Sequence, residues 1–199
     1  ICNGTMKQFK TGTFTNNNYY RLTKEIRNYG SFYNNKTFIG QDSYIFENYN
    51  LFNNANTATI TTNFGMINKK ENATNSDSVD LTNIKGYILN NGTFEHKSRV
   101  FTNNGLVTNN NILTNNDSIT LGSTGSIINN HTFTNDSIII NGGTLTNYSG
   151  KTITNNRTIT NNNIINNAGI MNITHTTGIL NNNLNYTNKS TATTNNNGI

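Results

Sequence analysis

The feature that most constrains this chain is a repeat of 20 residues in its second half. Two apolar series keep this step, and they consist of Leu113, Phe133, Ile153, Ile173 and of Ile119, Ile139, Ile159, Ile179. A polar series with the same step consists of Asn115, Asn135 and Asn155. Periods of this size are typical of solenoids, in which each repeat packs only on its neighbours. The repeat therefore predicts a coiled, elongated architecture.

The repeating unit has the pattern of a short β-strand followed by a turn. It is clearest in residues 151–156 (KTITNN) and 157–162 (RTITNN). Side chains alternate between the two faces of a strand, so the central Ile points one way and both Thr point the other. β-branched Thr and Ile favour strands, whereas Asn and Gly favour turns. Helical apolar spacing is absent, although residues 21–27 could form a short helix.

The expected inward residues are mostly six apart, with a gap of eight about every third step. They are Phe94, Val100, Val107, Leu113, Ile119, Ile127, Phe133, Ile139, Leu145, Ile153, Ile159, Ile165, Ile173, Ile179 and Leu184. Three strands per turn then give about 20 residues per coil, which predicts an all-β, three-sided parallel β-helix. A left-handed hexapeptide helix would have about 18 residues per coil, so the longer coil favours the right-handed form.

Two regions differ in regularity. We expect irregular coils with loops, or a cap, over residues 1–89, and regular Asn/Thr-rich repeats over residues 90–199. The first region has the looser inward series Phe14, Tyr20, Ile26, Tyr33, Ile39, Phe46, Phe52, Ile60, Ile67, Thr74, Leu81 and Ile88. Residues 69–80 are the most loop-like stretch. About ten coils, stacked at about 4.8 Å, would form a rod about 50 Å long.

Composition and charge exclude several classes of protein. Hydrophobic residues make up 32% of the chain, a content typical of disordered segments, but their periodicity indicates a fold. The net charge is +5, yet the basic residues are interleaved with acidic ones, which disfavours nucleic-acid binding. No apolar run is long enough to insert in a membrane. Cys2 is the only cysteine, which excludes an intrachain disulfide.

Both ends of the sequence invite interpretation. The chain starts at Ile1 rather than Met, as it would after removal of a signal peptide or after other trimming. Residues 191–199 still resemble repeat material. They indicate either a longer array or an open end that meets another subunit, and a head-to-tail contact of that kind would produce filaments.

The polar columns suggest structural roles rather than catalysis. Asn115, Asn135 and Asn155 predict a ladder of stacked amides, and most other Asn are interpreted as corner residues. His96 and His131 share no column, and His175 continues the Asn column. We expect no catalytic residue, cofactor or metal site, because acidic residues are few and no Cys/His spacing or calcium-binding repeat is present.

Two further motifs have alternative meanings. Thr132/Thr134 stack on Thr152/Thr154 at a step of 20, and such Thr-x-Thr arrays resemble those of ice-binding solenoids, although Ile112 and Asn172 interrupt the column. Several Asn-x-Ser/Thr sequons permit glycosylation in a secreted protein, and they begin at Asn91, Asn116, Asn130, Asn156 and Asn172.

Residues 143–147 (GTLTN) and 102–110 (TNNGLVTNN) resemble the Asn/Thr-rich β-solenoid repeats of bacterial and archaeal surface adhesins of the filamentous-haemagglutinin type. The resemblance covers residues 90–185. It implies an extracellular, right-handed parallel β-helix that serves in adhesion or structure. We therefore expect a non-enzymatic structural protein that assembles with itself, head-to-tail or side by side, into a cell-surface filament, sheath or fibre. Other surface proteins or glycans are further expected partners. A monomeric adhesin stalk, a viral fibre and an ice-binding protein remain alternatives.

Overall fold

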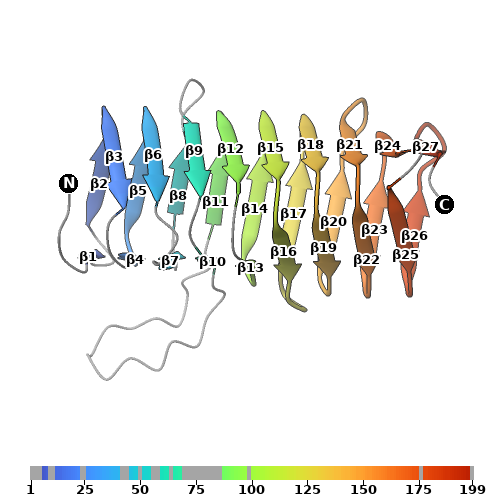
Figure 1. The fold of residues 1–199 in the computed structure, drawn as a ribbon, viewed down its shortest axis with the longest axis horizontal. Coiled ribbons are helices and arrows are strands. Elements are labelled where there is room, and N and C mark those ends of the chain that lie inside the picture. Colours follow the sequence, from blue (N-terminus) through green and yellow to red (C-terminus); the bar gives the residue numbers. More distant parts are fainter. Residues whose placement is uncertain are drawn as a thin grey trace.

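The computed structural model describes residues 6–8, 12–22, 26–40, 45–48, 51–54, 59–62, 65–68, 87–97, 100–174 and 177–197. Within these ranges the fold is all-β and contains no helix. Parallel strands stack into a rod with β1 near one end and β27 near the other (Figure 1). The chain visits three sheets in turn, which makes it a β-solenoid with three strands per coil. The right-handed sense of the coil stays a prediction.

Each sheet has nine strands in the described part of the chain. Sheet A consists of β3 (Tyr19–Leu22), β6 (Thr37–Gly40), β9 (Thr59–Thr62), β12 (Thr93–His96), β15 (Ile112–Asn115), β18 (Thr132–Asn135), β21 (Thr152–Asn155), β24 (Ile170–Ile173) and β27 (Thr193–Asn196). Sheet B consists of β1 (Met6–Gln8), β4 (Ile26–Asn28), β7 (Ile45–Asn48), β10 (Gly65–Asn68), β13 (Val100–Asn103), β16 (Ser118–Leu121), β19 (Ile138–Asn141), β22 (Thr158–Asn161) and β25 (Ile179–Asn182). Sheet C consists of β2 (Thr13–Asn16), β5 (Ser31–Asn34), β8 (Leu51–Asn54), β11 (Tyr87–Asn90), β14 (Leu106–Asn109), β17 (Ser126–Asn129), β20 (Thr144–Asn147), β23 (Ile164–Asn167) and β26 (Asn185–Asn188).

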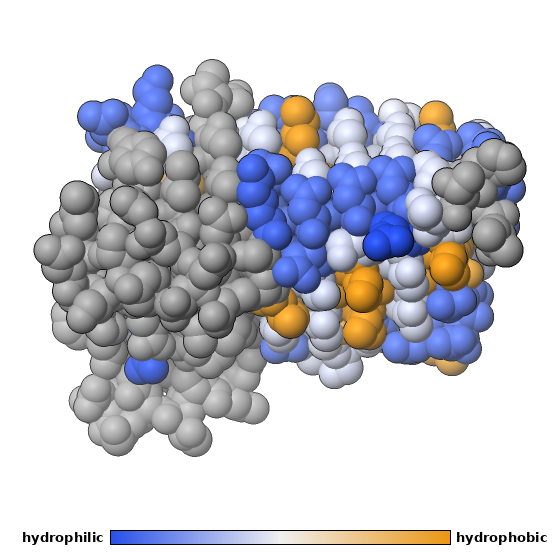
Figure 2. Space-filling model, viewed as in Figure 1, coloured by the Kyte–Doolittle hydropathy of each residue, from blue (hydrophilic) through white to orange (hydrophobic). Residues whose placement is uncertain are grey.

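Most strands have four residues and share one pattern of burial. The second and fourth residues are buried, and the first and third face outward, as in β21 and β22. The second is usually apolar and the fourth is usually Asn. The outer surface is therefore largely hydrophilic, with separate hydrophobic patches (Figure 2). A coil thus needs only about three apolar side chains for its core, which explains how so polar a chain can fold.

Corners between strands are short and bond to the corners of the preceding coil. The backbone N–H of Asp136, for example, donates to the carbonyl of Asn115 at 2.8 Å. Some corners admit no side chain at all, since a Cβ on Gly143 would lie 2.0 Å from the carbonyl oxygen of Gly125. The wider turn before β21 contains Gly150, whose φ of 71° favours glycine.

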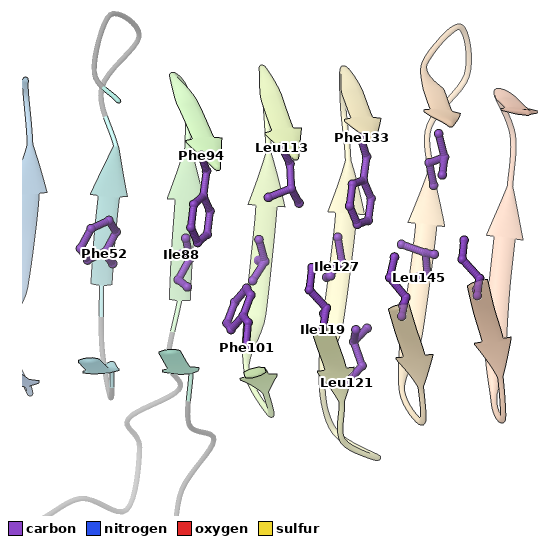
Figure 3. Close-up of a cluster of buried hydrophobic side chains, with 14 of the residues drawn as sticks. Phe52, Ile88, Phe94, Phe101, Leu113, Ile119, Leu121, Ile127, Phe133 and Leu145 are labelled. Atoms are coloured by element: carbon purple, nitrogen blue, oxygen red, sulfur yellow. The ribbon is translucent and has the colours of Figure 1, made fainter. Parts of the chain in front are cut away.

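The core is a stack of apolar side chains that runs through the middle of the rod (Figure 3). Leu113, Phe133 and Ile153 pair in register in sheet A, as predicted, and each is fully buried. Ile119, Ile139 and Ile159 do the same in sheet B. Burial of each such side chain contributes about 1.5–3 kcal/mol. An aromatic stack fills the earlier coils, where the Phe32 and Phe52 rings lie 4.9 Å apart.

The last members of both predicted columns were wrong. Met171, not Ile173, pairs with Ile153, and Ile173 follows Asn155 in the polar column, where it is still buried. Leu180 pairs with Ile159, which leaves Ile179 on the outer face with 39% of its surface exposed. The reason is coil length: the steps become 18 residues in sheet A and 21 in sheet B. A fixed step of 20 therefore loses register.

Several other inward assignments were wrong by one or two residues. Phe101 is buried and Val100 is outward, and Leu184 is exposed while Tyr186 faces the core. Phe32 is buried in place of the predicted Tyr33, and Phe38 is also buried. A shift of one residue reverses every side chain in a strand, and adjacent apolar pairs leave that choice open.

In the first half of the chain, strands occupy the place where a short helix was the alternative. Arg21 and Leu22 lie in β3, and Ile26 and Arg27 lie in β4, so the alternative of a short helix was wrong for these residues. The loop predicted over residues 69–80 lies outside the described residues, as does His175. All three sheets include strands from both predicted regions, 1–89 and 90–199.

Candidate functional site

The most developed polar feature is a set of amide ladders inside the solenoid. In sheet C the ladder passes without a break through nine coils, where each Nδ2 donates to the Oδ1 of the next coil at 2.7–2.9 Å. Its members are Asn16, Asn34, Asn54, Asn90, Asn109, Asn129, Asn147, Asn167 and Asn188. Such a ladder stabilises neighbouring coils in the way that stacked amides stabilise cross-β structures.

The predicted column of sheet A forms the second ladder. Asn115 Nδ2 donates to Asn135 Oδ1, and Asn135 Nδ2 donates to Asn155 Oδ1, both at 2.7 Å. All three side chains are completely buried. His96 precedes them in the same column and Ile173 follows.

Sheet B has the third ladder, over β19, β22 and β25, and a leucine precedes it in the same column. Asn141, Asn161 and Asn182 are linked at 2.6 and 2.7 Å. Leu121 takes the position between Asn103 and Asn141 and is 1% exposed. The interpretation of most Asn as simple corner residues therefore missed two of the three ladders.

Most ladder Asn also stabilise the corner that follows them in the chain. The Nδ2 group of Asn135 donates to the Ser137 carbonyl in its own corner and to the Thr158 carbonyl in the next coil. In other corners the Oδ1 atom accepts the N–H two residues on, as Asn141 does from Gly143. This is an Asx-turn, so one side chain both forms the corner and bonds the coils together.

The sequons occupy three structural environments. Asn91, Asn116, Asn130 and Asn156 are the first residues of corners and reach the surface, where each bonds to a polar side chain of a neighbouring coil. Asn130 Nδ2, for example, donates to Asn110 Oδ1 at 2.8 Å. Asn172 lies on the outer face of β24 and accepts a hydrogen bond from Asn195. Asn135 also begins a sequon, but its amide is buried in the inner ladder, which closes it to modification in the folded chain.

The outward faces of the three sheets differ in hydrophobicity. Among the side chains whose burial the structure describes, sheet B has four exposed large apolar ones, which are Val100, Ile138, Ile140 and Ile179. Within the same limits sheet A has two, Ile112 and Ile170, together with the predicted Thr-x-Thr rungs. Tyr148 and Leu184 lie in corners. Figure 2 shows hydrophobic patches on both sides of a hydrophilic stripe that follows the rod.

The described titratable groups do not converge on one place. His96 is buried beside the ring of Phe101, with centroids 6.0 Å apart, and His131 is exposed, with its Nδ1 3.1 Å from the Thr132 hydroxyl. Glu95 pairs with Lys97 at 3.2 Å on the surface. No group of three His, Cys, Asp or Glu in the described ranges could hold a metal. Among those residues, no helix is long and apolar enough to span a bilayer.

The arrangement is repetitive: the inner polar groups bond to one another, and the outward residues of strands β13 to β27 are all uncharged. Comparisons of the chain with protein-family models, with curated proteins and with solved structures found no match.

Proposed function

We propose that this protein is an extracellular structural rod that assembles side by side with copies of itself into a filament, sheath or fibre. The observation that carries the proposal is the outward face of sheet B. Val100, Ile138, Ile140 and Ile179 expose 39–48% of their surfaces there. Large apolar groups gathered on one flat face are typical of interaction surfaces.

The rows of this face are in register from coil to coil. Ile138 pairs with Ser118 on one side and with Thr158 on the other, and Ile140 pairs with Thr120 and Thr160. Outward residues on β13, β16, β19, β22 and β25 are all uncharged. A second copy of the same face would therefore meet no ionic group that must lose its water.

Low charge over the regular coils supports the same conclusion. Residues 100–197 contain the basic residues Lys151, Arg157 and Lys189 and the acidic residues Asp117 and Asp136, three minus two, for a net charge of +1. Soluble monomers usually maintain a larger net charge and many more surface charges. Repulsion between parallel rods would be weak.

The size of the face indicates how strong a single contact would be. Four residues at about 3.3 Å and five strands at about 4.8 Å give a patch of about 300 Å². Stable pairs bury about 800 Å² on each partner. One contact would be weak and would join only two rods face to face, so a polymer needs further contacts between rods in addition to this face.

The test is an assembly assay with matched variants. Wild-type protein at increasing concentration should form large species in sedimentation velocity and fibres or sheets in negative-stain images. The double variant Ile138→Lys/Ile140→Lys on β19 should remain as single rods. Its control, Thr144→Lys/Thr146→Lys, adds the same two charges to β20 in the same coil and should still assemble. Single rods from the wild-type chain would overturn the proposal and favour the monomeric stalk.

An extracellular location is supported by the resemblance to surface adhesins and by the surface corner sequons. Antibodies against the regular coils should label intact, unpermeabilised cells of the native source. Labelling only after permeabilisation would contradict this part of the proposal, and labelling of virus particles would favour the viral fibre.

A further inference from the structure

The outward face of sheet A contains an ordered array of threonines that the assembly face does not use. We propose that this face, over β15, β18 and β21, binds ice. The inference is independent of self-assembly, because it concerns a different sheet and needs only a single rod.

Pairing between coils sets the order of the array. At the first outward position Ile112, Thr132, Thr152 and Ile170 follow one another, each paired with the next. At the second outward position, which is the third residue of each strand, the series is Thr114, Thr134, Thr154 and Asn172 in the same register. Every side chain before Asn172 is Thr or Ile, and all eight residues are uncharged.

The array is two-dimensional and has fixed spacings. Neighbouring coils place equivalent residues about 4.8 Å apart, and the two outward positions of one strand lie about 6.6 Å apart. These repeats are close to the two repeats of water oxygens on exposed faces of hexagonal ice. A match in both directions lets several hydroxyl groups occupy lattice positions of one crystal surface together.

Threonine suits this task because it is rigid and has two different groups on Cβ. β-branched side chains have few accessible χ1 rotamers, so little conformational entropy is lost on binding a lattice. Within the described residues, the hydroxyls of Thr134, Thr152 and Thr154 have no hydrogen-bond partner in the protein. The Thr132 hydroxyl lies 3.1 Å from His131 Nδ1. The hydroxyls can therefore bond lattice water while the methyl groups order the water between them.

The array has clear limits on both sides. Glu95 follows Thr93 on β12, and a charged side chain would disrupt an ice-like layer of water. On the other side, Asn172 on β24 has no methyl group, and its Oδ1 accepts a hydrogen bond from Asn195. The binding face thus comprises three rungs and the flanking Ile170, which is 37% exposed.

Sheet C provides a matched comparison. At the third residue of its strands, Ile128 lies between Thr108 and Thr146. At the first residue, the row consists of Leu106, Ser126 and Thr144. No two successive rungs of sheet C repeat the Thr-x-Thr pattern from β14 to β23. Substitutions there alter the same residue type on the same fold without touching the ordered array.

The experiment measures thermal hysteresis and adsorption of fluorescently labelled protein to a growing ice hemisphere. Wild-type protein should show both. Thr134→Lys/Thr154→Lys should lose both, whereas the control Thr108→Lys/Thr146→Lys should retain both. Circular dichroism and melting temperature confirm that each variant is folded.

Two results would overturn the inference: absence of hysteresis and adsorption in the wild-type protein, or equal loss in both variants. The non-assembling variant Ile138→Lys/Ile140→Lys separates this inference from the proposed function. It should still adsorb to ice, and its loss of adsorption would show that no single rod has an ice-binding face.

Discussion

Removal of one ladder amide is the sharpest test of what stabilises the solenoid. We expect Asn135→Ala to destabilise the folded chain by about 3 kcal/mol. The Asn135 side chain is completely buried. Its two N–H groups are shared among Asn155 Oδ1 at 2.7 Å, the Ser137 carbonyl at 2.9 Å and the Thr158 carbonyl at 3.2 Å. Its Oδ1 accepts from Asn115 at 2.7 Å.

The magnitude follows from counting hydrogen bonds. The variant loses two donated bonds and one accepted bond, and each contributes about 1 kcal/mol net in a folded protein. Asn155 Oδ1, the ladder acceptor left behind, is buried and cannot recover water. A loss of about 3 kcal/mol is a large fraction of the 5–15 kcal/mol by which domains are usually stable.

The assay is equilibrium urea unfolding followed by far-ultraviolet circular dichroism. Asn116→Ala is the control, because this adjacent corner residue is exposed and its side-chain amide donates to Glu95 Oε1 at 3.1 Å on the surface. That variant should lose less than about 0.5 kcal/mol. Equal effects of the two substitutions would refute the conclusion that the inner ladders contribute to stability beyond what the backbone and core provide.

Five other substitutions test the core, the corners and the gap in the ladder of sheet B. Phe133→Ala should cost about 3–5 kcal/mol in the same urea assay, since the ring is fully buried. Gly143→Ala should yield little soluble protein, because its Cβ would meet the carbonyl of Gly125 at 2.0 Å. Gly150→Ala has open space and should cost only about 1–2 kcal/mol from its positive φ, and soluble yields compare the two. Leu121→Asn should lower the melting temperature less than Leu121→Ala does, because the new amide can join the ladder on either side.

Much of the fold could be predicted because each repeating unit has the residue pattern of one strand and one corner. In KTITNN the alternation of Thr and Ile sets the strand and the Asn pair sets the corner. The stacks of Leu113 on Phe133 and of Ile119 on Ile139 followed from the step of 20 alone. The same step failed at Ile173 and Ile179, because the step between coils there is 18 residues in sheet A and 21 in sheet B. The difference in length lies in the corners, since the strands keep four residues.

The inner ladders were partly visible in the sequence. Alternation places Ile153 and Asn155 on the same face of a strand, so an inward Asn could have been inferred for every unit of this form. The polarity of Asn disfavours an inward position, because a buried amide is costly unless it is fully hydrogen-bonded. Only the three-dimensional stack shows that the bonds are supplied by the equivalent Asn of the next coil. At Val100 and Phe101 the sequence offered two apolar neighbours, and the choice depended on packing in adjacent coils.

The direction of the ladder bonds has an electrical consequence. Within the three inner ladders each Asn amide donates toward the later coil, as Asn109 does to Asn129, so the ladder amide dipoles point the same way along the rod. Corner backbone groups do the reverse: the N–H of Asn130 donates to the carbonyl of Asn109 in the earlier coil. The two sets of dipoles oppose each other within every coil. A long helix accumulates partial charge at its ends, whereas the opposition of these two sets limits the field that builds along the solenoid axis as coils are added.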